Sequence, residues 1–278
     1  MRESDAADTG TVSMKSAATA SPRGPGRAVI DVDPIISIVI PALNEEKLIE
    51  QTLRVFSPEL RARHGIELIV SDGGSRDRTV EIAREHADIV VEHREERRQT
   101  ISEGRNRGAE VATGTLLVFI CADTIPRDPE KFMQGLARFA RSAPGSGKIA
   151  AIACPVEIAP EERRTSDLLF HAFFNNYVRL LNLVGIGMGR GECQVIRRES
   201  FLAVGGYDSA MVAGEDFDLY SRLARIGRIG HSNDLRVYES PRRFRRYGYL
   251  RVLASWTTNG LAVMLLHRSV SKEWEEIR

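Results

Sequence analysis

The sequence predicts an α/β domain built on a doubly wound, mostly parallel β-sheet. Two patterns predict this fold: short β-branched runs alternate with segments of helical periodicity, and several of these runs end in loops that carry acidic or amide side chains. Bulk composition agrees, because 278 residues that are 42% hydrophobic and 28% charged suit one large globular domain with a sizeable core.

The first predicted unit is a strand followed by a helix. Residues 35–40 form a β-branched run that Pro41 ends, which is typical of a strand buried on both faces. Asn44 is expected to cap the next helix, because Glu45 and Glu46 would then place negative charge at the positive end of the helix dipole.

The strand-and-helix pattern repeats along the chain. Further strands are predicted at 67–71, 88–92 and 116–120, and further helices at 77–85 and 100–112. This alternation favours parallel pairing through right-handed crossovers. The second half is less regular, with a helix at 165–184, a glycine-rich loop at 185–191, a strand at 193–197 and a helix that starts near Glu215.

The two ends of the chain differ from the centre. Residues 1–33 are rich in Ser, Ala, Gly and Pro without periodicity, which predicts a flexible tail before a folded domain at 34–240. Residues 241–278 are predicted to be a basic and amphipathic helical extension. Such a segment is typical of a membrane-surface or lipid-phosphate contact, but it equally suits a helix that packs on the same domain or on a second subunit of a homodimer.

Charge and cysteine usage narrow the class of protein. Lysine and arginine number 39 against 38 acidic residues, which gives no support for a nucleic-acid partner. Cys121, Cys154 and Cys193 lack Cys-x-x-Cys spacing, so free thiols in a reducing compartment are expected rather than disulfides or a zinc site. No apolar run reaches the roughly 20 residues of a membrane span, so we expect a cytoplasmic protein, with peripheral contact at the inner face of the membrane as a further hypothesis.

Three loops follow predicted strands and carry polar side chains. They are residues 41–45, 72–75 and 121–124. Ligands of doubly wound sheets bind outside the carboxyl ends of the strands, so these loops predict the position of the functional site.

Four motifs occur in one order along the chain. They are ISIVIPALNEE at 36–46, VSDGGSRDRT at 70–79, ADT at 122–124, and GGYD at 205–208 ahead of GED at 214–216. Each motif alone is a common turn, but together they resemble the inverting family-two glycosyltransferases over roughly residues 35–246. The resemblance implies the nucleotide-diphospho-sugar transferase fold called GT-A, a Mg²⁺ or Mn²⁺ cofactor, and one-step displacement at the anomeric carbon.

A nucleotide-sugar donor needs groups that hold its base and ribose. Asp72, at a strand end, can accept the ring N–H of uracil or guanine, and the resemblance implies this role; the alternative is an Asx hydrogen bond within its own turn. Glu45 suits ribose binding or a helix start equally. The other predicted donor contacts in these loops are Pro41, Ala42, Asn44 and Ala122.

Departure of a nucleoside diphosphate requires a cation on the leaving phosphate. Asp123 is the predicted metal ligand, with a purely structural role as the alternative. The Asp-x-Asp of the family reads here Cys121-Ala122-Asp123, and a thiol is a poor ligand for magnesium, so ribose recognition through the first position is in doubt.

The acceptor hydroxyl needs a general base in the transition state. The resemblance implies that Asp216 is this base and that Glu215 beside it contacts substrate. Both acids stand at a predicted helix start, where they could instead compensate the helix dipole. Asp218 is expected to be a solvated or helix-start charge.

Basic side chains should face the diphosphate. Arg105 with Asn106 matches the family position for this, and Arg242 and Arg243 belong to an Arg-rich segment that closes over the diphosphate in many family members. The loop at 185–191 does not follow a strand as a dinucleotide fingerprint requires, so it is expected to shape the sugar and acceptor pocket.

The predicted function is transfer of a hexose-type sugar, with inversion, from a nucleoside diphosphate sugar to an acceptor hydroxyl. Family frequency favours UDP over GDP, and a lipid phosphate, a glycan or a small molecule could supply the hydroxyl. Two alternatives stay open. One is a non-catalytic nucleotide-sugar binding module, supported by the lost acid at Cys121. The other is a sugar nucleotidyltransferase, whose glycine- and arginine-rich phosphate loop does not resemble residues 41–44.

Overall fold

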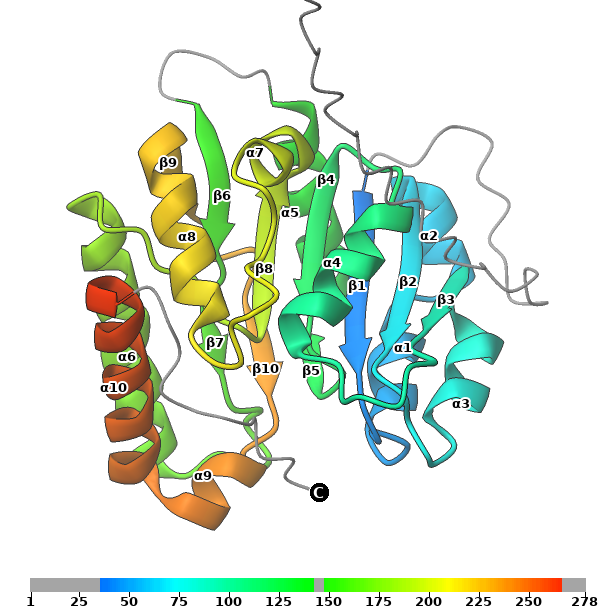
Figure 1. Cartoon of the computed structure of the whole chain (residues 1–278), viewed down its shortest axis with the longest axis horizontal. Helices are drawn as coiled ribbons and strands as arrows, with labels where there is room; N and C mark the ends of the chain where they lie inside the picture. The colour runs from blue at the N-terminus through cyan, green and yellow to red at the C-terminus, as the bar shows by residue number, and fades with distance from the viewer. Residues whose placement is uncertain (1–35, 143–147, 267–278) are drawn as a thin grey trace, which may run out of the picture.

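The computed structural model describes residues 36–142 and 148–266. The predicted tail at 1–33, and residues 267–278 of the predicted C-terminal extension, lie outside the described residues. Figure 1 shows a central sheet with helices on both faces. The doubly wound α/β fold is therefore confirmed.

A seven-stranded sheet forms the centre of the molecule in the order β3-β2-β1-β4-β8-β6-β9. The first four strands in this order pair in parallel, so their carboxyl ends meet at one edge. β8 runs antiparallel to both β4 and β6, with Cys193 opposite Ile120, so the loop before β8 reaches the same edge. The strands are β1 Ile36–Ala42, β2 Ile66–Asp72, β3 Ile89–Glu92, β4 Leu116–Ile120, β6 Ile149–Ala153, β8 Cys193–Arg197 and β9 Arg228–His231.

A second, three-stranded sheet lies at the carboxyl ends of β1 and β4 (Figure 1), in the order β5-β10-β7. Its strands are β5 Thr124–Pro126, β7 Val156–Glu157 and β10 Val237–Glu239. β10 pairs antiparallel with β5, and Glu239 stands opposite Thr124. No pattern in the sequence predicts this sheet, which brings the chain after β10 to the end of β4.

The strands are buried on both faces because their alternate residues enter two different cores. In β1, Ile38 and Ile40 belong to one core and Val39 to the other. Helices of the first core are α1 Ile49–Val55, α2 Pro58–His64, α3 Thr79–His86 and α5 Pro129–Arg141. Helices of the second are α4 Ile101–Val111, α6 Thr165–Leu183, α7 Arg198–Ala203 and α8 Glu215–Ile226.

The loop after β1 differs from its prediction. Pro41 does not end the strand, which continues to Ala42, and α1 begins only at Ile49. Asn44 takes a left-handed backbone conformation with φ 54° and caps no helix. Its N–H donates to the Ser75 hydroxyl at 2.8 Å, and its side-chain oxygen accepts from the Arg76 N–H at 2.9 Å. The capping prediction is wrong because Asn44 joins the loops after β1 and β2.

The described part of the C-terminal extension packs on α6. It forms α9 Arg242–Tyr247 and α10 Tyr249–Leu266. The ring of Phe170 on α6 lies 5.4 Å from Phe244 on α9, and Phe174 lies 5.3 Å from Trp256 on α10. Figure 1 shows α10 beside α6. In the described ranges, no helix combines the length and apolar character that crossing a membrane needs.

Candidate active site

A cavity of about 860 Å³ opens at the edge where β1 and β4 end. The residues that line it are spread between Pro41 and Gly260, so the site is not one continuous segment of the sequence. Asn44 and Asp72 are absent from its lining. The predicted site residues that line it are Pro41, Ala42, Glu45, Arg105, Ala122, Asp123, Glu215, Asp216, Arg242 and Arg243.

Asp72 serves the turn that follows β2. One carboxylate oxygen accepts the N–H groups of Gly74 at 2.8 Å and Ser75 at 2.9 Å, and the other accepts the Ser75 hydroxyl. Asp72 is only 2% exposed. The structure therefore contains the Asx turn of the alternative interpretation, and the contact between Asp72 and a nucleobase stays a prediction.

Arg242 joins two acids that come from the ends of β1 and β4. Its guanidinium donates to both carboxylate oxygens of Glu45, with a distance of 3.0 Å from Nη1 to Oε2. It also lies 3.1 Å from Oδ2 of Asp123. Burial raises the pKa of Asp123, while the nearby positive charge of Arg242 acts in the opposite direction. This corner of the cavity is an acidic pair held together by one cation.

This corner fits a divalent cation only if phosphate oxygens and water complete the coordination that Asp123 begins. Within the described ranges there is no group of three His, Cys, Asp or Glu side chains arranged to hold a metal. A single carboxylate such as Asp123 is a sufficient protein ligand for Mg²⁺ or Mn²⁺ when phosphate oxygens and water supply the other ligands. The contact of Asp123 with a guanidinium shows that its oxygen attracts a cation.

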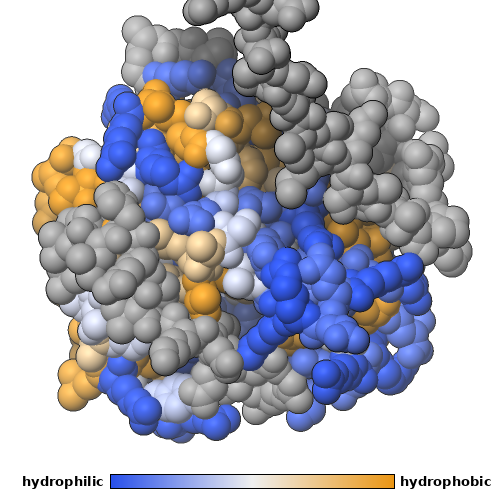
Figure 2. Space-filling view, viewed as in Figure 1, coloured by the Kyte–Doolittle hydropathy of each residue, from blue (hydrophilic) through white to orange (hydrophobic). Residues whose placement is uncertain are grey.

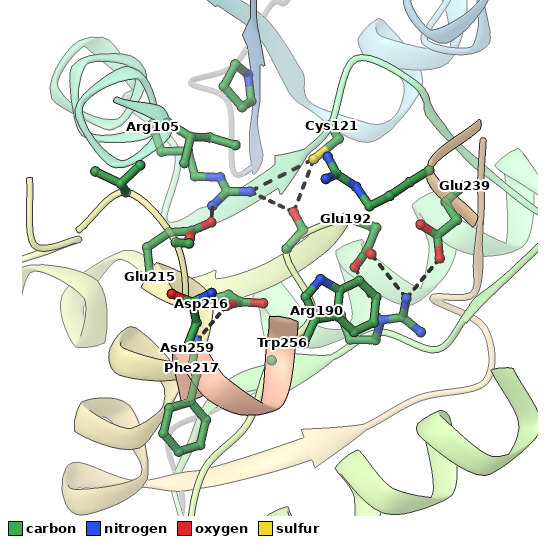
Figure 3. A pocket seen from close by; sticks show the side chains of 18 of the residues that line it. Arg105, Cys121, Arg190, Glu192, Glu215, Asp216, Phe217, Glu239, Trp256 and Asn259 are labelled. Carbon is green, nitrogen blue, oxygen red and sulfur yellow. Dashed lines mark hydrogen bonds and ion pairs between the residues drawn. The ribbon is translucent and has the colours of Figure 1, made fainter. Parts of the chain in front are cut away.

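Arg105 lines the cavity, but its side chain is almost completely buried. Its Nη1 donates to Oε1 of Glu215 at 2.6 Å, and its Nη2 donates to the carbonyl of Gly191 at 2.7 Å (Figure 3). Its side chain is 1% exposed. The neighbouring Asn106 donates to the carbonyl of Tyr207 and accepts its N–H. Both predicted diphosphate contacts therefore hold segments of the site in place, and a direct contact of Arg105 with a donor stays a prediction.

Asp216 is a carboxylate with a raised proton affinity. Burial raises its pKa to about 7, and the negative charges of Glu215 and Glu192 contribute. A methyl group on Gly191 would lie 3.6 Å from Oδ2 of Asp216, so the carboxylate faces the loop before β8. Figure 3 shows it beside Glu215 at the start of α8. A carboxylate that titrates near neutral pH has the property that a general base needs.

The first turn of α8 sets the positions of Glu215 and Asp216. Gly214 stands at the N-cap with φ 80°, a left-handed conformation that glycine adopts without strain. Asp218 stands in the first turn of α8, which confirms its interpretation as a helix-start charge. It is 7% exposed and pairs with Arg222 one turn later. Its interpretation as a solvated charge is wrong, because the guanidinium of Arg222 also holds the carbonyls of Val204 and Gly206 and keeps the pair buried.

Four charged residues that line the cavity are absent from the predicted site: Arg98, Arg190, Glu192 and Glu239. Arg190 donates to Glu192 at 3.1 Å and to Glu239 at 2.9 Å, and both carboxylates turn toward it (Figure 3). Burial and the charge of Glu192 raise the pKa of Glu239 well above its usual range. Arg190 lies in the predicted pocket loop, but no local pattern marks either glutamate, because the unpredicted small sheet brings Glu239 here.

The family model for Glycosyl transferase family 2 matches residues 37–205. These residues make up more than half of the chain. The chain belongs to glycosyl transferase family 2.

Sequence similarity to two further proteins agrees with membership of this family. The chain is 32% identical over 114 residues to validoxylamine A glucosyltransferase of Streptomyces hygroscopicus subsp. limoneus, covering 40% of this chain and 25% of that protein. It is 30% identical over 194 residues to succinoglycan biosynthesis protein ExoA of Rhizobium meliloti (strain 1021), covering 68% of this chain and 58% of that protein. The chain thus spans between a quarter and three fifths of the length of these relatives.

Solved structures confirm the GT-A fold. Mannosyltransferase PcManGT from Pyrobaculum calidifontis, in complex with GDP-Man and Mn²⁺, aligns with a TM-score of 0.63 at 18% identity, over 88% of this chain and 68% of that one. Glucosyl-3-phosphoglycerate synthase from Mycobacterium tuberculosis, in complex with Mn²⁺ and UDP, aligns with a TM-score of 0.54 at 24% identity, over 84% and 79%.

This family 2 member has a thiol where the motif usually has its first acid. Cys121 donates to the carbonyl of Gly191 at 3.3 Å, and burial raises the pKa of its thiol. The three cysteines are free, as expected; Cys154 and Cys193 are fully buried and Cys121 is partly buried. The neutral Cys121 thiol adds no charge beside Asp123, so Asp123 alone represents the acidic motif at the end of β4.

The buried ion pair of Arg105 and Glu215 is expected to stabilise the folded site of this family 2 member. Arg105→Met should lower the free energy of unfolding by about 3–5 kcal/mol, because it leaves a buried carboxylate without its partner. Urea denaturation measures this. The double variant Arg105→Met/Glu215→Met should recover much of the loss, since it removes both charges.

An exposed ion pair supplies the matched control for that experiment. Arg54 pairs with Glu50 on α1, and its side chain is 68% exposed. Arg54→Met should cost only about 0–1 kcal/mol. Equal costs for Arg54→Met and Arg105→Met would contradict a role for the buried pair in holding the site.

Proposed function

We propose that this chain transfers a hexose-type sugar from a nucleoside diphosphate sugar to an acceptor hydroxyl, with inversion at the anomeric carbon. One observation carries the proposal. A carboxylate with a pKa near 7, Asp216, lines the same cavity as the acid Asp123 and the arginines Arg242 and Arg243. A base for the acceptor and groups for a diphosphate therefore share one site.

The donor half of the cavity is charged. Arg242 and Arg243, at the start of α9, supply positive charge for a diphosphate, since arginine binds phosphate through paired N–H donors. Asp123 would hold a Mg²⁺ or Mn²⁺ ion, which neutralises the charge that builds on the leaving phosphate. The neighbours in complex with GDP-Man and Mn²⁺, and with UDP and Mn²⁺, support a nucleotide and a divalent cation in this fold.

Arg242 has two functions in this proposal. Without a donor it pairs with Glu45 and Asp123. A diphosphate offers stronger negative charge, so Arg242 turns to the phosphates and leaves the oxygen of Asp123 open to the metal. Glu45 is then released for the ribose, which is its predicted partner.

The base of the donor is proposed to be uracil. Asp72 would accept its ring N–H, since a carboxylate has about four acceptor sites and the turn uses three of them. Guanine presents the same kind of N–H. The neighbours carry both nucleotides, so family frequency is the only support for UDP over GDP.

The reaction is a single displacement. The acceptor oxygen forms a bond to the anomeric carbon while the bond from that carbon to the diphosphate oxygen breaks, and Asp216 takes the hydroxyl proton. Attack opposite to the leaving group inverts the anomeric carbon. Glu215 is less suited to this role than Asp216, because its Oε1 already accepts from Arg105 at 2.6 Å.

A thermal-shift panel tests donor binding. UDP- and GDP-sugars, each with and without Mn²⁺, should raise the melting temperature only for the accepted nucleotide, and more strongly with metal, because ligands stabilise by mass action. Slow release of free sugar from the donor, which depends on Mn²⁺, then separates an enzyme from a non-catalytic binding module. If no nucleotide sugar shifts the melting temperature, the proposal is wrong.

A further inference from the structure

Helix α6 exposes a stripe of large apolar side chains. Leu169 is 67% exposed, Phe173 60%, Leu180 57% and Leu183 73%. Together with Tyr177, which is 42% exposed, they recur three to four residues apart, so they follow one side of the helix. Single exposed apolar residues are ordinary, but a contiguous stripe of this size indicates a surface that contacts something apolar. Figure 2 shows hydrophobic surface along the left edge of the molecule, beside the position of α6 and α10 in Figure 1.

The stripe continues into the cavity. Phe173, Tyr177 and Ile186 are 60%, 42% and 42% exposed, and the same three side chains line the cavity. Farther in, the lining contributed by α6 and α10 is also apolar. It includes Phe174, Leu181, Leu253 and Trp256. An apolar surface therefore leads from the outside of α6 toward the cavity that holds Asp216.

The two halves of the cavity thus differ in chemistry. The ends of β1 and β4 and the start of α9 supply charged groups, and α6 with α10 supplies mostly rings and aliphatic chains, with polar groups at Tyr177, Thr257 and Asn259. A small sugar acceptor would bury its hydroxyls against a surface with few hydrogen-bond partners, which costs free energy for each hydroxyl that stays unpaired. An acceptor with a long apolar segment avoids that cost and gains from its burial.

Charge next to the stripe indicates where such an acceptor comes from. The segment 242–251 contains five arginines and no acidic residue. Its helices pack directly on α6, with the ring of Phe170 4.5 Å from Tyr249. Arg246 and Arg251 in this segment are exposed. Apolar side chains beside arginines are the combination that binds an anionic lipid surface.

We infer that the α6 stripe docks on an anionic membrane and that the apolar chain of a lipid acceptor enters the cavity past Phe173 and Tyr177. The inference rests on the proposed function, because it names the class of acceptor for that site. The lipid hydroxyl is then presented to Asp216, while the charged half holds the donor.

Vesicle flotation with the full chain tests the docking. Vesicles of phosphatidylcholine with phosphatidylglycerol should carry the protein, and vesicles of phosphatidylcholine alone should carry much less. The triple variant Leu169→Gln/Leu180→Gln/Leu183→Gln should bind the anionic vesicles at least about tenfold more weakly, since each leucine loses apolar burial. These residues lie outside the cavity lining.

Leu202→Gln is the matched control, because Leu202 on α7 is 63% exposed and lies outside the stripe. It should bind vesicles like the parent. Equal binding by the triple variant and the parent, or no binding of the parent to anionic vesicles, overturns the inference. So does a parent dimer that becomes a monomer in the triple variant without loss of vesicle binding, because the stripe would then contact a second copy.

Bromine-labelled acyl chains test the entry into the cavity. They quench tryptophan on contact, so labelled anionic vesicles should quench the parent more than Trp256→Phe, which keeps only the other tryptophan of the chain. Equal quenching of both overturns entry of the chain. The thermal shift with nucleotide sugars should be the same in the triple variant and the parent. Failure of the donor to bind and failure of docking are thus separate results.

Discussion

Asp216→Asn should lower the catalytic rate about 100- to 10,000-fold while leaving donor affinity nearly unchanged. The amide keeps the size and hydrogen-bonding capacity of the side chain but cannot take the proton of the acceptor. Single-turnover kinetics measure the rate, and calorimetry with a nucleoside diphosphate measures binding. A loss of activity that only follows the loss of folded protein would remove Asp216 from the mechanism.

The pH dependence of the parent belongs to the same prediction. The pKa of Asp216 is raised to about 7, and the base acts only when deprotonated. Turnover per bound donor should therefore fall about tenfold for each pH unit below 7 and level off above it. A rate that stays constant down to pH 5 would show that Asp216 is not the base.

The neighbouring variant Glu215→Gln is not a suitable control for Asp216→Asn. Glu215 is adjacent, but Glu215→Gln would disturb the buried contact with Arg105. Asp234→Asn makes the same chemical change at a side chain that is 44% exposed and lies outside the cavity lining. It should keep the rate of the parent within the error of the measurement.

Asp123→Ala should abolish the metal dependence of diphosphate binding and leave the fold intact. In the proposed site this carboxylate links the cation to the protein, and no second acid of its motif can replace it, because Cys121 is a neutral thiol. Calorimetry with UDP and GDP, each with and without Mn²⁺, measures the effect. Unchanged affinity and unchanged metal requirement would exclude Asp123 as the ligand.

Arg242→Met should change the binding of the metal and of the diphosphate in opposite directions. Removal of the guanidinium frees Oδ2 of Asp123, which it approaches to 3.1 Å, so Mn²⁺ alone should bind more tightly than in the parent. The diphosphate should bind more weakly, since a phosphate partner is lost. Weaker binding of both ligands would contradict competition between Arg242 and the metal.

Much of the fold could be predicted from local patterns. The apolar runs of β1, β2 and β4 are buried on both faces, and Thr100 with Glu103 forms the capping box at the start of α4. The short strands β5, β7 and β10 could not be predicted, because two or three residues are too few to show a periodic pattern. Asn44 suits a helix cap or a left-handed turn, and only contact with Ser75 decided between them.

The sequence by itself determined that acids after the first and fourth strands lie at the carboxyl edge of a parallel sheet, where ligands of such sheets bind. It thereby placed Asp123 at this edge, whereas Asp216 was identified through the resemblance to the family. Only the tertiary structure decided which charges neutralise one another. Arg105 and Glu215 are 110 residues apart, and Arg242 and Glu45 are 197 apart. Such pairings depend on the path of the whole backbone, whereas local sequence encodes periodicity, caps and turns.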